Sequence, residues 1–286
     1  MNEPKKQHFV PVMLLKRFAR PDGKFFFHDR RSPDNLIRPT TPENILHQRY
    51  LYSPQNDDGV RDFSLEHRYA RLEHAADQLL DRIEGVLNKA IDPILAGTNR
   101  ELLELFIYEQ WRRVPDMHVR VLTHESFRSR VEAAIEEFEQ KFRPLSEAEK
   151  DTLIGSINTA EIRKQIPGRA LRKSSGEVLG IFRDKTLVFV EAPDGSEFVI
   201  GSSNVIKTSD QSSDLRHSSV EIWLPFNPRY CVVLVGRMDL PARVVTTPDQ
   251  VHSINQALAQ KSSIIATKNT DLIQTLRPGS KVVDLA

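Results

Sequence analysis

A change in hydrophobic pattern near residue 160 constrains the fold of this chain more than any other feature. Before it, apolar residues recur at three- and four-residue intervals over 64–87 and 122–142, the spacing of amphipathic helices. After it, short apolar runs rich in β-branched residues, such as Thr186–Glu191 and Ile264–Thr267, are typical of strands. Helices first and strands later predict an α+β fold, in which a helical bundle packs against a mixed, largely antiparallel sheet.

The same pattern divides the chain into four predicted segments. One early strand is expected at Lys24–His28, after the turn at Pro21-Asp22-Gly23. Thr186–Glu191 and Glu197–Ile200 flank an Asp-Gly turn and predict a hairpin. The segments are an irregular amino-terminal stretch with one strand packed on the core (1–63), a helical bundle (64–160), a basic linker (161–176) and a strand-rich α+β part (177–286).

Charge and cysteine content exclude several classes of protein. The formal net charge is +1, so no global field attracts nucleic acid or membranes. The single cysteine, Cys231, excludes an intrachain disulfide framework and cysteine-rich zinc sites, and it fits a reducing compartment. No apolar run reaches the roughly 18 residues that a membrane helix needs. We therefore expect a cytoplasmic protein with no membrane partner.

Short catalytic motifs give weak signals. No glycine-rich phosphate loop is present. The stretch "PDGSEFV" imitates the acidic signature of restriction-type nucleases, but Val199 stands where that site needs lysine; a turn is the favoured interpretation. Arg113 and His118 have the spacing of a helical ribonuclease class, yet Pro115 interrupts the helix between them. A helix end is the favoured interpretation there.

A series of motifs in a fixed order resembles one bacterial family. These motifs are "QHFVPVMLLKRFA", "SLEHRYARLEHAADQLLDRI", "LFIYEQWRRVPDMHVR", "FVIGSSNVI", "WLPFNPRYCVVLV" and "VHSINQALAQKSSIIAT". They are similar to those of the domain of unknown function 4238 family and span nearly the whole chain. The resemblance implies a shared architecture and brings no established activity. It singles out His8, Pro11, Glu66, Glu73, Gln110, Arg113, Pro115 and Asn255.

The chain departs from the family pattern at one place. Where members often read Ser-Asp-x-Pro, this sequence reads Gly201-Ser202-Ser203-Asn204. If the family aspartate is catalytic or binds a metal, this chain has lost it.

The positions that the resemblance singles out suggest a site with two possible roles. His8, Glu66 or Glu73, Gln110 and Arg113 are expected to converge in space. As an enzyme, the protein would be a metal-assisted phosphodiesterase or nuclease. Glu66 and Glu73 would hold a divalent metal such as Mg²⁺ or Mn²⁺, His8 would act as acid or base with Gln110 beside it, and Arg113 would hold phosphate. The favoured reading is instead a buried, fully hydrogen-bonded salt-bridge network with a structural role.

A second class of function needs no catalysis. A binding module would recognise a nucleotide, nucleic acid or protein through the sheet and the basic linker. Phosphate contacts made by lysine and arginine give salt-sensitive binding. A run of basic residues like that of the predicted linker is, however, usually an exposed, solvated segment. The ligand-binding candidates are Arg169, Arg172, Lys173 and Asn255.

Overall fold

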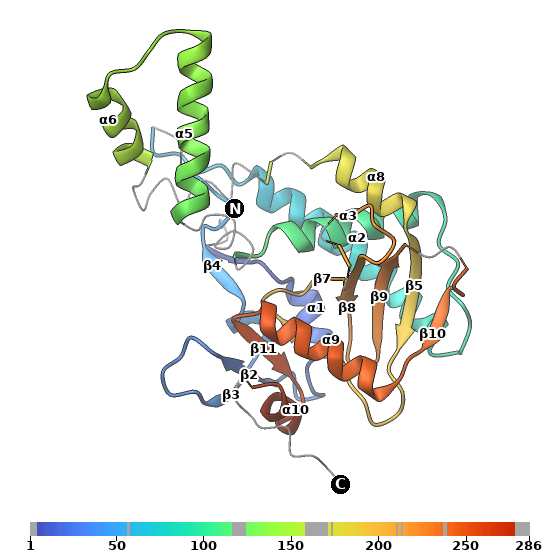
Figure 1. Ribbon diagram of the computed structural model, residues 1–286. Helices are drawn as coiled ribbons and strands as arrows, with labels where there is room; N and C mark the ends of the chain where they lie inside the picture. The colour runs from blue at the N-terminus through green and yellow to red at the C-terminus, as the bar shows by residue number, and fades with distance from the viewer. Residues whose placement is uncertain are drawn as a thin grey trace.

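A computed structural model describes most of the chain and confirms the α+β class. The described residues are 5–55, 58–115, 124–157, 171–172, 174–209, 211–212, 214–236 and 239–277. Helices and strands pack in layers around a central five-stranded sheet (Figure 1). In these residues no helix is both long and apolar enough to cross a membrane.

The central sheet is mixed. Its strand order is β10-β5-β9-β8-β7, and only the β10–β5 pair is parallel. Every residue of β9 is buried, which explains why its sequence is a continuous apolar run. The strands are β5 (Thr186–Glu191), β7 (Ile206–Thr208), β8 (Glu221–Pro225), β9 (Tyr230–Val235) and β10 (Arg243–Val245).

Helices cover both faces of this sheet. Alternate residues of β9 enter different apolar clusters: Val232 and Leu234 join the cluster of α2 and α3, and Val233 joins that of α9. This follows from the two-residue period of a strand. Figure 1 shows α2, α3 and α8 on one side and α9 on the other. The bounds are α2 (Ser64–Leu87), α3 (Gly97–Arg112), α8 (Gly176–Asp184) and α9 (Pro248–Lys261).

A second, antiparallel sheet joins the two ends of the chain. Its order is β3-β2-β11-β6, so the predicted early strand pairs with a strand more than 230 residues later in the sequence. The short helix α10 (Thr270–Thr275) follows β11. The strands are β2 (Phe25–Asp29), β3 (Ile37–Thr40), β6 (Ile200–Gly201) and β11 (Ile264–Thr267).

The predicted hairpin at 186–200 is wrong. β5 pairs with β9 and β10, whereas β6 belongs to the second sheet. Asn255 on α9 accepts from the Val199 N–H at 3.0 Å and donates to the Glu197 carbonyl at 2.8 Å. It therefore occupies the backbone groups that a hairpin partner would need. The turn itself is present, with Gly195 at φ +83°.

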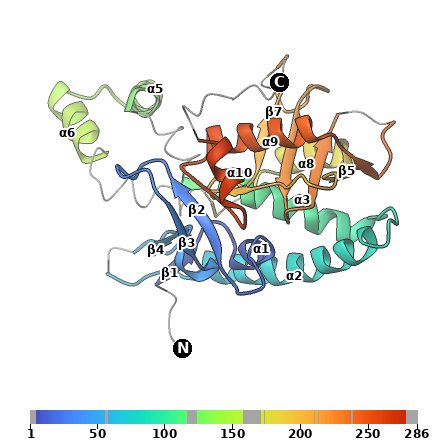
Figure 2. The ribbon, with the colours of Figure 1, turned by 90° about the horizontal axis from the view of Figure 1, so that it is seen from below.

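The amino-terminal segment is more regular than predicted. Besides β2 and β3 it holds β1 (Lys6–His8), α1 (Val12–Arg17), the 3₁₀ turn η1 (Pro42–Asn44) and β4 (His47–Arg49). β1 pairs antiparallel with β4 across some forty residues. Figure 2 shows this ribbon and α1 beside α2. Such short strands exist only because a distant partner supplies their hydrogen bonds.

Two pairs of helices lie within the segment predicted as a helical bundle, and α2 packs against α3 in the first of them. α5 (His124–Lys141) and α6 (Glu147–Ile157) contact each other and lie apart from α2 and α3 in Figures 1 and 2. Most of the predicted basic linker lies outside the described residues. Its end is packed: Leu171 is buried, and the Ser174 hydroxyl donates to Glu109 at 2.6 Å.

Candidate functional site

An open pocket lies between the amino-terminal segment and α2. It has a volume of about 260 Å³. Acidic residues spaced three, four or seven apart share one face of a helix, so α2 presents Glu66, Glu73 and Asp77 to this space. Pro11 directly precedes α1, and its carbonyl accepts from the Leu14 and Leu15 N–H groups, fixing the corner beside His8. The lining residues are His8, Val12, Met13, Glu66, Ala70, Glu73, His74 and Asp77.

Arg113 lies fully buried behind the pocket wall. Its guanidinium donates to Glu73 Oε1 at 2.6 Å, to the Phe9 carbonyl at 3.0 Å and to Gln110 Oε1 at 3.2 Å. It also lies 4.9 Å from the centre of the Tyr69 ring. With these partners Arg113 orients Glu73 and joins α3 to the amino-terminal segment. It does not line the pocket, which argues against the predicted contact with phosphate.

Gln110 is also fully buried. Besides Arg113, its Oε1 accepts from Asn204 Nδ2 at 3.1 Å. Tyr52 completes this layer, because its hydroxyl donates to the Arg113 carbonyl at 3.2 Å. Sequence reasoning assigned no role to Tyr52, Tyr69 or Asn204, because their roles depend on partners distant along the chain.

Glu66 differs from Glu73 although both lie on the same face of α2. Among the described residues Glu66 has no ion-pair or hydrogen-bond partner. Burial and then the charge of Glu73 raise the pKa of Glu66 from 4.5 to about 7, against the opposing effect of Arg113. A partly buried carboxyl group that titrates near neutral pH in a pocket is a candidate functional group.

The surroundings of His8 lower its pKa and so favour the neutral form of the ring. Burial, and then the charges of His47, Arg113 and Lys6, lower the pKa to about 4, although a hydrogen bond to the Glu43 backbone opposes this. With this lowered pKa the ring is neutral near pH 7. Its Nε2 is buried and has no hydrogen-bond partner among the described residues.

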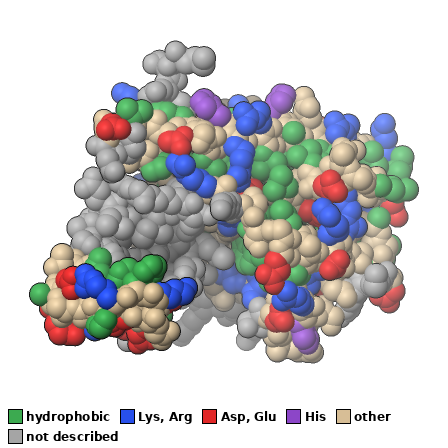
Figure 3. All heavy atoms as spheres, turned by 90° about the horizontal axis from the view of Figure 1, so that it is seen from above, with side chains coloured by type: hydrophobic (Ala, Val, Ile, Leu, Met, Phe, Trp, Pro, Cys, Tyr) green, Lys and Arg blue, Asp and Glu red, His purple; other side chains and the backbone are tan. Residues whose placement is uncertain are grey.

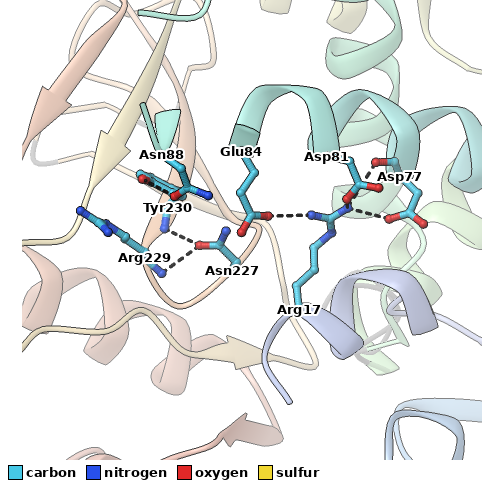
Figure 4. Close-up of polar contacts among 8 residues, drawn as sticks. All are labelled: Arg17, Asp77, Asp81, Glu84, Asn88, Asn227, Arg229 and Tyr230. Carbon is cyan, nitrogen blue, oxygen red and sulfur yellow. Dashed lines mark hydrogen bonds and ion pairs between the residues drawn. The ribbon is translucent and has the colours of Figure 1, made fainter. Parts of the chain in front are cut away.

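The other carboxylates beside the pocket are paired. Arg17, on α1, donates to Asp77 at 2.7 Å, Asp81 at 2.5 Å and Glu84 at 2.9 Å (Figure 4). Within the described part of the chain, no group of three or more His, Cys, Asp or Glu side chains is arranged to hold a metal ion. A divalent cation at Glu66 and Glu73 would therefore need further ligands from substrate or water, as Mg²⁺ often does.

The remaining predicted ligand-binding residues lie elsewhere. Asn255 is buried in α9, where its amide clamps the 197–199 backbone. Arg172 is half-exposed and pairs with Asp62 at 2.5 Å. Arg169, Lys173 and His118 lie outside the described residues.

The departure from the family pattern does not fall in the pocket. Ser202 is buried, and its hydroxyl accepts from the N–H groups of Ser263 at 2.9 Å and Ile264 at 3.2 Å. This position therefore holds β6 against the start of β11. Ser202 stands outside the lining of the pocket at Glu66.

The family follows from comparison with known proteins. No curated protein and no solved structure matches the chain. The family model described as "Protein of unknown function (DUF4238)" matches residues 6–271 of the 286. The chain therefore belongs to the DUF4238 family.

Proposed function

We propose that the pocket between α1 and α2 is the active site of a hydrolase that cleaves phosphodiester bonds in nucleic acid with a divalent cation. One observation carries the proposal. Glu66 is an unpaired carboxyl group, among the described residues, with a pKa of about 7 in an open pocket. A group that titrates near the working pH is suited to transfer a proton in a general acid–base step.

His8 supplies the complementary group. Its ring lines the pocket and is neutral near pH 7. Its Nε2, which is buried and has no hydrogen-bond partner among the described residues, can accept a proton from a group that reaches it. The Glu66 carboxylic acid and the His8 lone pair thus give the pocket one proton donor and one acceptor at neutral pH.

Charge explains why a cation is part of the proposal. Glu66, Glu73 and Asp77 would repel a phosphodiester, and both nearby arginines are engaged, Arg113 with Glu73 and Arg17 with Asp77. Mg²⁺ or Mn²⁺ between the carboxylates and the phosphate would remove this repulsion. Glu73 would hold the ion with further ligands from substrate and water, which leaves Glu66 for proton transfer in place of the metal ligation that the sequence predicts. Arg113 would act as a positioning residue through Glu73.

The test is cleavage of single-stranded and duplex DNA and RNA by the purified protein, with Mg²⁺, Mn²⁺ or a chelator. We expect cation-dependent cleavage that falls at least about 100-fold in Glu66→Gln, because removal of a general acid or base costs roughly 10²–10⁴ in rate. Asp81→Asn is the matched control, because it removes an acid of the same helix that does not line the pocket. Absence of cleavage under every condition, or full activity in Glu66→Gln, contradicts the proposal.

The competing function is a non-catalytic module that binds nucleotide, nucleic acid or protein. Its support is Arg172, a half-exposed cation at the end of a basic run. Figure 3 shows positive and negative side chains interspersed on the face seen from above. This mixture argues against an extended surface for nucleic acid on that face. Binding without cleavage that weakens with salt and in Arg172→Ala would favour the module. For both functions we expect action in the cytoplasm.

A further inference from the structure

The β1–β4 ribbon carries a row of basic side chains beside the pocket at Glu66. In its antiparallel register Lys6 is opposite Arg49, and His8 is opposite His47. Opposite residues point to the same side of a two-stranded ribbon, and so do residues two apart on one strand. These four side chains therefore share one side, which we call the ribbon face. The ring centres of His8 and His47, 5.2 Å apart, agree with this arrangement.

Lys6 and Arg49 are like charges placed directly opposite one another. Both are exposed, and among the described residues neither has an ion-pair partner. Lys6 Nζ donates to Asn44 Oδ1 at 3.4 Å, and the Arg49 guanidinium lies 5.9 Å from the centre of the Tyr50 ring. Like charges at opposite positions weaken the pairing of two strands, so stability does not account for this pair. An anion bound between the two side chains would compensate both charges.

An aromatic ring stands beside these cations at the end of β4. Tyr50 has a φ of +54°, a left-handed conformation that bulky residues rarely adopt, and its N–H donates to the Lys5 carbonyl at 3.1 Å. The Arg61 guanidinium lies over the Tyr50 ring, 3.9 Å from its centre, and donates to the Ser53 carbonyl at 3.0 Å. Basic residues interleaved with aromatic rings are typical of sites for single-stranded nucleic acid.

His8 connects the ribbon face to the pocket. It belongs to the ribbon face and also lines the pocket. The positive charge of Lys6 extends along this face: burial is the first cause that lowers the pKa of His47, and the charge of Lys6 is the second. Glu43, which precedes β4, is paired with Lys16 at 3.7 Å. A phosphate chain held on the ribbon face would thus reach the pocket at His8.

We propose that the ribbon face binds the backbone of a single-stranded nucleic acid and leads the strand into the pocket. Lys6 and Arg49 hold phosphates, and the Tyr50 ring with Arg61 offers a planar surface to a base. This inference rests on the proposed hydrolase and names the form of its substrate. The acids of the pocket repel phosphate, so the strand needs cations outside the pocket. Unpaired bases can stack on aromatic and guanidinium planes, which favours a single strand over a duplex.

The test is fluorescence anisotropy of labelled single-stranded DNA, single-stranded RNA and duplex DNA with the full chain, in a chelator that prevents cation-dependent cleavage. We expect the double variant Lys6→Gln with Arg49→Gln to bind single strands roughly tenfold more weakly. Its plot of log affinity against log salt should be less steep by about 1.4, because each phosphate contact on a single strand contributes about 0.7.

The matched control is the double variant Arg82→Gln with Lys89→Gln. It removes the same charge from exposed positions at the far end of α2 and just beyond it, so its binding and salt dependence should equal those of the unchanged protein. Thermal unfolding of the Lys6 and Arg49 variant should occur at the same or a higher temperature, because a like-charge pair is removed. A lower unfolding temperature would show that the two residues support the fold and would overturn the interpretation.

The remaining outcomes separate this inference from the proposed hydrolase. Preference for the duplex, no binding of any oligonucleotide, binding of phosphatidylserine vesicles in its place, or equal binding by the variant and its control overturns the ribbon site. If binding and cleavage are both unchanged in the variant, the ribbon site fails and the hydrolase stands. If single strands bind through Lys6 and Arg49 but are never cleaved with any cation, the ribbon site stands and the hydrolase fails.

Discussion

At the scale of single residues, two neighbouring groups have pKa values shifted in opposite directions. Burial favours the neutral form of both, so it raises the pKa of Glu66 and lowers that of His8. Arg113 forms an ion pair with Glu73 at 2.6 Å. The same pocket therefore holds one carboxylate with an ion-pair partner and one, Glu66, that has none among the described residues.

Glu66 should make the protein less stable as the pH rises. Its pKa is about 4.5 unfolded and about 7 folded, so its stabilising effect is fully present below pH 4.5 and lost as the pH rises through 7. We predict that Glu66→Gln raises the free energy of unfolding by about 1–3 kcal/mol at pH 8 and changes it little at pH 4.5. Urea unfolding of both proteins at the two pH values measures this. An equal effect at both would show that the charge of Glu66 is not responsible.

At the scale of secondary-structure elements, side chains that bond to backbone decide how elements meet. Figure 4 shows the end of α2 tied to the central sheet, where the Tyr230 hydroxyl donates to Asn88 Oδ1 at 3.0 Å. Asn227 shapes the turn before β9 by accepting from the Arg229 and Tyr230 N–H groups. On the other face Asn255 and Ser202 hold β6 between α9 and β11. Each such side chain fixes a contact that strand pairing alone leaves open.

The contact of β6 with α9 is close enough to require glycine. A Cβ at Gly201 would overlap the Ser262 hydroxyl and lie 2.5 Å from Leu258 Cδ2. We predict that Gly201→Ala lowers the free energy of unfolding by about 1–3 kcal/mol, since overfilling a packed interior forces neighbours apart. Gly180→Ala in α8 is the control, because its Cβ would meet nothing within 4 Å. It should raise stability by roughly 0.5–1 kcal/mol, as alanine favours a helix interior. Denaturant unfolding of the two variants should shift in opposite directions.

At the scale of the whole molecule, the fold depends on pairing between distant parts of the chain. β2 lies beside β11, and the central sheet of the carboxy-terminal half is covered by α2 and α3 of the amino-terminal half. Among the side chains that the structure describes, neither buried apolar cluster includes a residue of α5 or α6. One of the two clusters combines residues of the segments 64–160 and 177–286.

Two deletions test this dependence. Residues 177–286 alone should show no cooperative thermal unfolding, because they lack β2 and the helices that cover β9. The full chain with 124–157 replaced by a flexible linker should unfold cooperatively within a few degrees of the intact protein. Circular dichroism melts of both proteins measure this. Cooperative unfolding of residues 177–286 alone, or loss of cooperativity when 124–157 are replaced, would contradict a core shared between the two halves of the chain.

The sequence alone determined the elements with a strong local pattern. β5, β11 and α2 lie where the sequence pattern predicts them, and α3 ends at Arg112, shortly before Pro115. Local propensity and hydrophobic period are properties of neighbouring residues, so a linear pattern carries them. Of the residues that the family resemblance singles out, five lie together beside α2, whereas Asn255 lies in α9. The five are His8, Glu66, Glu73, Gln110 and Arg113.

Only the tertiary structure decided which strands pair and which charges are compensated. The Asp-Gly turn after β5 predicted a hairpin, but Asn255, more than fifty residues later, takes the backbone groups of that segment. Glu66 and Glu73 look equivalent in sequence, yet only Glu73 meets Arg113. Register, ion pairing and pKa depend on atoms brought together from distant parts of the chain, and no local pattern encodes those distances.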